Sequence, residues 1–137
     1  NDYHGSSAVI EYAVNILEVK HIIVCGHSHC GACKSLYQDF GDSADLVNVK
    51  KWLDLGKRAK EYTLLAIQDK SDPEKLYRAT ERISIVHQME NLLTFPEVER
   101  KVKNGELQIH GWYYRIEDGT IEYYDGEECS FKPLKEN

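Results

Sequence analysis

The stretch that most constrains the fold covers residues 22–33, with the sequence IIVCGHSHCGAC. Its first three residues are apolar and β-branched, which is typical of a buried strand. Gly26 ends the apolar run, and the chain is expected to turn through Gly31 into a short helix over residues 32–37. His27 and Cys30 lie three residues apart in the turn between strand and helix. Because zinc binds histidine nitrogen and cysteine sulfur, we predict a metal site with His27 and Cys30 as ligands.

Helical periodicity predicts four further helices. Three of them cover residues 7–17, 46–62 and 74–93, and the fourth runs from the Thr94–Glu97 segment to residue 104. Ser7 is the expected cap of the first helix, and Gly56 is expected to interrupt the second. Thr94 and Glu97 have the spacing of a capping box, and Gly105 is a typical stop after a helix.

The remaining strands are predicted near the end of the chain. Residues 107–116 read as a second strand, and residues 120–124 as its return across an Asp118-Gly119 turn. The last residues read as a polar tail. A strand, several helices and another strand indicate a parallel crossover. We therefore predict an α/β fold with a parallel β-sheet core flanked by helices and a C-terminal antiparallel hairpin strand. Residues 1–137 are expected to form a single domain.

Charge and length exclude several classes of partner. The chain has 17 Lys and Arg residues against 23 Asp and Glu residues, a net charge of −6. An acidic chain is a poor ligand for nucleic acid or for an anionic membrane surface. No apolar run reaches the length of a membrane span, and no secretory leader begins the sequence. A cytoplasmic location is expected, unless a leader has been removed, and the four cysteines then favour metal or redox use.

Residues 24–32, VCGHSHCGA, resemble the zinc motif of the β-class carbonic anhydrases. Residues 7–14 resemble the helix that this family places before the motif strand. Residues 109–114, IHGWYY, resemble its late strand. The resemblance covers nearly the whole chain and implies the family's α/β fold. It identifies residues 1–137 as the C-terminal majority of such a domain.

The resemblance implies a zinc lyase (a carbonate dehydratase) that hydrates carbon dioxide reversibly to bicarbonate and a proton. His27 and Cys30 match two of the family's three protein ligands of Zn2+. The third ligand and an Asp–Arg pair belong to a Cys-x-Asp-x-Arg segment that would lie before Asn1, so no catalytic residue is assigned within the chain. The family also implies a homodimer or tetramer. Tyr114 matches a tyrosine that helps hold a non-catalytic bicarbonate in some members.

Several side chains near the predicted site allow two interpretations. Cys33 could join His27 and Cys30 as a third ligand, although a small buried helix residue is the simpler interpretation. Cys25 is expected in the core. His29 is expected at the surface, with proton transfer as the alternative.

Three other functions remain open from the sequence. Relatives of the family hydrolyse carbonyl sulfide or carbon disulfide with the same ligands. The Cys30-x-x-Cys33 spacing also fits a thiol oxidoreductase. A truncated or degenerate chain would be a non-catalytic zinc-binding or assembly module. Because two protein ligands do not make a catalytic zinc site, we expect the 137 residues alone to hydrate carbon dioxide poorly.

Overall fold

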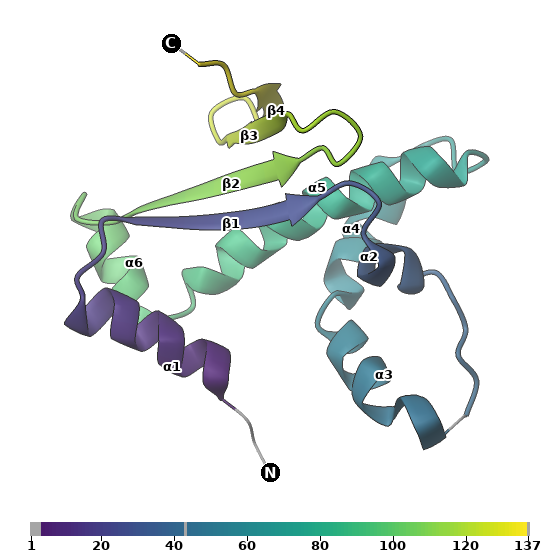
Figure 1. Ribbon diagram of the computed structural model, residues 1–137, viewed down its shortest axis with the longest axis horizontal. Helices are drawn as coiled ribbons and strands as arrows, with labels where there is room; N and C mark the ends of the chain where they lie inside the picture. The colour runs from purple at the N-terminus through teal and green to yellow at the C-terminus, as the bar shows by residue number, and fades with distance from the viewer. Residues whose placement is uncertain (1–3, 43, 137) are drawn as a thin grey trace.

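The computed structural model describes residues 4–42 and 44–136 of the chain (Figure 1). Its helices are α1 (Gly5–Glu11), α2 (Gly31–Ser35), α3 (Val47–Asp54), α4 (Lys57–Ala66), α5 (Pro73–Leu92) and α6 (Pro96–Lys103). A π-helical turn, Tyr12–Ile16, continues α1, and a 3-10 turn, Ala44–Leu46, precedes α3. The strands are β1 (His21–His27), β2 (Gln108–Tyr114), β3 (Ile121–Asp125) and β4 (Ser130–Pro133).

The four strands form one mixed sheet in the order β1-β2-β3-β4. β1 and β2 run parallel, from the pair His21 and Gln108 to the pair His27 and Tyr114. β3 pairs antiparallel with β2, and β4 pairs antiparallel with β3. These pairings confirm the predicted α/β fold with its C-terminal hairpin. The prediction of a polar tail is wrong for residues 130–133, which form β4.

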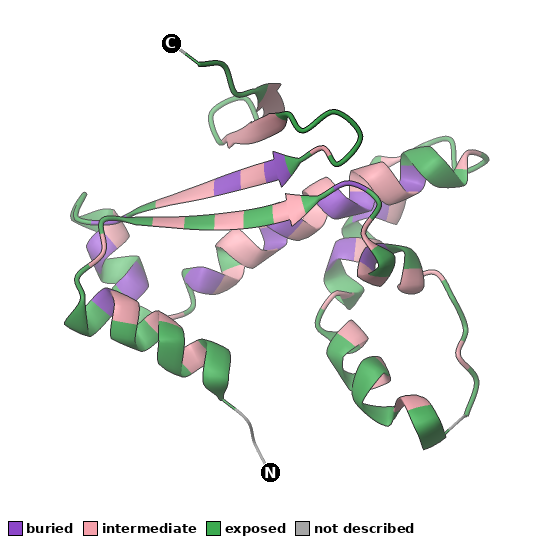
Figure 2. Cartoon of the chain, in the orientation of Figure 1, coloured by how far each residue is buried: buried purple, intermediate pink, exposed green. Residues whose placement is uncertain are grey.

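The core lies on one side of β1 and β2, where α1, α5 and α6 pack (Figure 1). Its buried members are Val14, Leu92, Val98 and Leu107. Alternate residues of β1 face away from this core, and Ile23 among them is 46% exposed. Figure 2 shows the resulting alternation of exposed and half-buried residues along β1. The described residues therefore cover one face of this strand and leave the other open.

α5 approaches the sheet closely because two glycines face it. A Cβ atom added at Gly26 of β1 would lie 2.7 Å from two side-chain atoms of Ile85. A Cβ atom added at Gly111 of β2 would lie 3.0 Å from Cγ2 of Ile85 and 2.6 Å from Sδ of Met89. Both contacts are shorter than ordinary packing allows, so larger residues would push α5 away from the sheet. The glycine before His27 therefore sets the distance between the candidate metal site and α5.

The helix boundaries show which local signals act. Asp72 caps α5 by accepting hydrogen bonds from the backbone N–H groups of Glu74 and Lys75, and Pro73 takes the first helical position. Gly56 separates α3 from α4 as predicted, and Gly105, with a φ of 73°, follows the end of α6.

Two predicted caps are wrong. α1 begins at Gly5, so Ser7 lies inside the helix and does not cap it. α6 begins at Pro96 after Phe95, with no side-chain cap from Thr94. The hydroxyl of Thr94 instead donates to the carbonyl of Asn91. Proline already fixes φ and lacks an N–H group, so a helix can begin there without a capping side chain.

Candidate metal centre

His27 is the last residue of β1 and lies at the carboxyl end of the parallel strand pair. Its Nδ1 atom is 2.7 Å from the carbonyl oxygen of Ser28. A carbonyl oxygen only accepts hydrogen bonds, so Nδ1 carries the ring proton and Nε2 carries the free lone pair. A backbone acceptor that fixes the tautomer in this way is typical of histidines that bind metals. The geometry therefore makes Nε2 the available ligand atom of His27.

Cys30 immediately precedes α2 and is half-buried. Its backbone is extended, and its carbonyl accepts a hydrogen bond from the N–H group of Lys34. A cavity of about 200 Å3 adjoins both Cys30 and His27. It is lined by Val24, Cys25, Gly26, His27, Cys30, Cys33, Glu81, Ser84, Ile85 and Gln88. One imidazole nitrogen and one thiol sulfur beside a cavity fit the ligand chemistry of zinc.

Cys33 is buried in α2 and does not complete this pair. Burial, followed by the neighbouring Cys30 and Glu81, raises the pKa of the Cys33 thiol to about 12. Near neutral pH this thiol is therefore protonated, which makes it a poor nucleophile. Within residues 4–42 and 44–136, no group of three or more His, Cys, Asp and Glu side chains is placed to hold a metal. The structure thus favours the buried helix residue over the third ligand.

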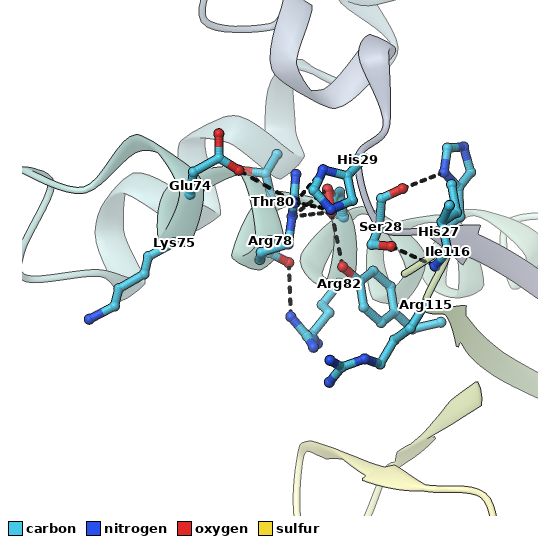
Figure 3. A network of polar contacts seen from close by, with 12 residues as sticks. His27, Ser28, His29, Glu74, Lys75, Arg78, Thr80, Arg82, Arg115 and Ile116 are labelled. Atoms are coloured by element: carbon cyan, nitrogen blue, oxygen red, sulfur yellow. Dashed lines mark hydrogen bonds and ion pairs between the residues drawn. The ribbon is translucent and has the colours of Figure 1, made fainter. Parts of the chain in front are cut away.

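Ser28 anchors the turn that carries both candidate ligands (Figure 3). It is fully buried, and its backbone N–H group donates to the carbonyl of Tyr114. Its hydroxyl accepts from the N–H group of Ile116 at 2.8 Å and donates to Glu117 at 2.5 Å. That hydrogen bond from Ser28 is the main reason why the pKa of Glu117 lies below its ordinary value. Three hydrogen bonds thus attach the turn to the last residue of β2 and to the chain that follows it.

A buried carboxylate, Glu81, lies on α5 at the wall of the cavity and is 2% exposed. It accepts a hydrogen bond from Nε of Arg78 at 3.1 Å and one from the hydroxyl of Tyr113 at 2.9 Å. Burial and the hydrogen bond to Glu81 raise the pKa of Tyr113, so its hydroxyl remains a donor. A buried charge needs such partners to offset its desolvation. Arg78 also contacts both ring nitrogens of His29, at 2.9 and 3.1 Å (Figure 3).

The buried contacts of Glu81 with Arg78 and Tyr113 were not predicted from the sequence, because helical periodicity places charged residues on the solvent side of a helix. The three-residue spacing of Arg78 and Glu81 signals a salt bridge on one helix face. It does not signal burial, because the buried partner, Tyr113, is 32 residues away. His29 is exposed as predicted.

One further residue departs from its prediction. Cys25 is exposed rather than in the core, because it faces the open side of β1. His110 is hydrogen-bonded to His21, at the start of β1. Of the neighbouring tyrosines, Tyr113 points into the protein and Tyr114 is 40% exposed.

Comparison with known proteins gives a consistent answer. Residues 1–121 match the family described as carbonic anhydrase. A carbonic anhydrase of Synechocystis is 39% identical over 124 residues, which are 89% of this chain and 44% of the relative. A carbonic anhydrase of Helicobacter pylori is 35% identical over 131 residues, which are 94% of this chain and 59% of the relative. The chain thus spans about half the length of the curated relatives that it matches.

Solved structures agree with the sequence matches. The β-carbonic anhydrase CcaA superposes with a TM-score of 0.83 at 34% identity, over 98% of this chain and 60% of that one. A tetrameric β-carbonic anhydrase of Sordaria macrospora superposes with a TM-score of 0.70 at 29% identity, over 86% of this chain and 58% of that one. On the sequence match, the fold and the motif strand together, the chain belongs to the β-class carbonic anhydrases.

Proposed function

We propose that this chain contributes to a zinc enzyme that hydrates carbon dioxide reversibly to bicarbonate and a proton. The observation that carries the proposal is the turn after β1, where His27 presents a free Nε2 beside Cys30 and a cavity. The carbonic anhydrase relatives support the reaction. The nitrogen and sulfur donors support zinc as the metal.

The chain's own residues would bind and orient in this reaction. His27 Nε2 and Cys30 Sγ would hold the metal, and the carbonyl of Ser28 would keep the imidazole in the required tautomer. Zinc bound there would supply a nucleophile from water near neutral pH. Glu117 and Ile116 would hold the turn through the hydroxyl of Ser28. A catalytic zinc has three protein ligands as a rule, so one donor beyond His27 and Cys30 is required.

The competing functions receive less support. The protonated, buried thiol of Cys33 is a poor partner for dithiol exchange, which disfavours an oxidoreductase. The curated relatives are named for carbonic anhydrase activity, which favours carbon dioxide over carbonyl sulfide and carbon disulfide. A purely assembling module would not need the tautomer of His27 to be fixed.

The proposal includes a homo-oligomer. The tetrameric relative from Sordaria macrospora supports it, and so do large apolar side chains left exposed on α1, its π-helical turn and α4. They include Val9, Ile16 and Leu65, which are 69%, 64% and 83% exposed. Light scattering should give a mass of at least two chains, and a monomer at high concentration would refute the assembly.

No helix in the described part of the chain is long and apolar enough to cross a membrane.

The reaction is tested by stopped-flow hydration of carbon dioxide with zinc present. One protein is the 137-residue chain, and the other carries a family member's Cys-x-Asp-x-Arg segment fused before Asn1. We expect the fused chain to be faster by about 10–100-fold or more, because it gains a ligand and orienting groups. Cys30→Ser should abolish that rate, whereas Cys129→Ser, on the exposed turn before β4, should preserve it. Faster turnover of carbonyl sulfide or carbon disulfide than of carbon dioxide would refute the proposed substrate.

A further inference from the structure

Two histidines lie side by side at the opposite end of the parallel strand pair. Nδ1 of His21, at the start of β1, is 3.0 Å from Nε2 of His110 in β2. The ring centroids are 5.2 Å apart, and the ring planes are inclined by 32°. His21 is exposed and His110 is half-buried, so solvent reaches the pair.

The sheet holds this pair in place. His110 is opposite Ile23 in the parallel ladder, so His21 is its diagonal neighbour on the same face. That face is the open side of β1, opposite α1, α5 and α6 (Figure 1). Both histidines belong to strands whose backbones are hydrogen-bonded to each other. The backbone that carries both rings is therefore held by regular structure rather than by a loop.

The separation of these nitrogens matches that of two ligands on one metal ion. Imidazole nitrogens bind zinc at about 2.0–2.1 Å. At angles between about 90° and 109°, two such ligands lie roughly 2.9–3.4 Å apart. The observed 3.0 Å falls in this interval. A cation bound by both nitrogens would lie to one side of the line that joins them. The two rings would turn toward it, and the backbone of both strands would stay in place.

We propose that His21 and His110 form a second metal site, which takes a divalent transition metal of the zinc class. Imidazole suits zinc, copper and nickel, so this chemistry excludes magnesium and calcium as the preferred occupants. The described residues bring no third His, Cys, Asp or Glu side chain to the pair, so water completes the coordination. Binding requires the donor ring to move its proton to its other nitrogen, and no net proton is released from a neutral pair.

This site is independent of the candidate centre at His27. His27 lies six positions after His21 in β1, which corresponds to about 20 Å along a strand. The two sites therefore share no ligand. Failure of the proposed carbonic anhydrase reaction would leave the second site untouched, and the reverse also holds.

Zinc titration of the 15N-labelled 137-residue chain tests the proposal, with the imidazole nitrogens followed by NMR. We expect Nδ1 of His21 and Nε2 of His110 to shift together along one binding curve, separate from that of His27. His110→Ala should weaken zinc binding at His21 roughly tenfold or more, since even outer groups around a metal contribute about 10–100-fold. His4→Ala, which removes an exposed histidine on another element, should leave the curve unchanged.

A backbone amide spectrum of each variant shows that the fold is retained. The wild-type titration alone decides the question if a variant fails to fold. The proposal is overturned if both rings keep their metal-free shifts at a large excess of zinc, or if only one of them responds. It is also overturned if His21 binds zinc equally well in His110→Ala.

Discussion

Ser28 connects the candidate metal centre to the sheet through a single hydroxyl group. It is fully buried, and it is the acceptor for the N–H group of Ile116 and the donor to Glu117. An intramolecular hydrogen bond of this kind typically contributes about 0.5–1.5 kcal/mol to the free energy of unfolding. The turn that carries His27 and Cys30 therefore depends on a residue that binds no metal itself.

Replacing the buried Ser28 by Ala should lower the free energy of unfolding by about 1–3 kcal/mol at neutral pH, because it removes the hydrogen bonds of the hydroxyl with Ile116 and Glu117. Urea unfolding of the metal-free protein measures this change. Glu117→Gln should also destabilise the protein at neutral pH, since the amide replaces a charged acceptor.

The effect of Glu117→Gln should depend on pH in a defined direction. The folded protein lowers the pKa of Glu117, so the folded state binds this proton more weakly than the unfolded chain. The stabilisation is complete above the unfolded pKa, at about 4.3, and is lost as the pH falls through the lower folded pKa. The stability gap between wild type and Glu117→Gln should therefore close in acid. Glu127→Gln, an exposed control, should show no gap, and a gap for Glu117→Gln that persists in acid would contradict this assignment.

At the scale of elements, α5 packs closely on β1 where Ile85 contacts the backbone at Gly26. The close approach of their atoms leaves no room for a side chain at Gly26. The same helix carries Glu81 at the wall of the cavity, so a displaced α5 would also displace that carboxylate. Packing between α5 and β1 therefore determines where the α5 wall of the candidate site lies.

Gly26→Ala should lower the free energy of unfolding by about 1–3 kcal/mol, the typical effect of overpacking a core. Ile85→Val removes Cδ1, one of the atoms nearest to the added methyl group, so it should cost less in the Gly26→Ala background than alone. Gly126→Ala, where nothing lies within 4 Å, serves as the control. Urea unfolding of the four proteins measures the coupling, and additive effects would show that Ile85 is not the clashing side chain.

The elements predicted best are those with strong local signals. Twenty residues of helical periodicity after Asp72 and Pro73 predicted α5 almost to its ends. β4 was missed because four residues of mixed polarity, SFKP, carry little pattern. The exposure of Cys25 was mispredicted because an apolar run indicates a strand but not whether both of its faces are covered. The pair of His21 and His110 was not predictable, because 89 residues separate its members.

Over the whole molecule, the chain combines the β-class carbonic anhydrase fold with one open sheet face and exposed apolar helices. Its share of the family's length is about half, and its candidate centre offers one nitrogen and one sulfur. These features agree if the described residues supply His27 and Cys30 to a centre that other residues complete. The assignment of His27 and Cys30 as zinc ligands is the central claim, and it remains a prediction.

The absorption spectrum of the cobalt(II)-substituted protein tests that claim most directly. A thiolate bound to cobalt gives a charge-transfer band in the near ultraviolet, which histidines alone do not produce. The band should be present in wild type and in Cys33→Ser, lost in Cys30→Ser and weakened in His27→Ala. A band that survives Cys30→Ser and disappears in Cys33→Ser would show that the metal is held by a different thiol and would contradict the account.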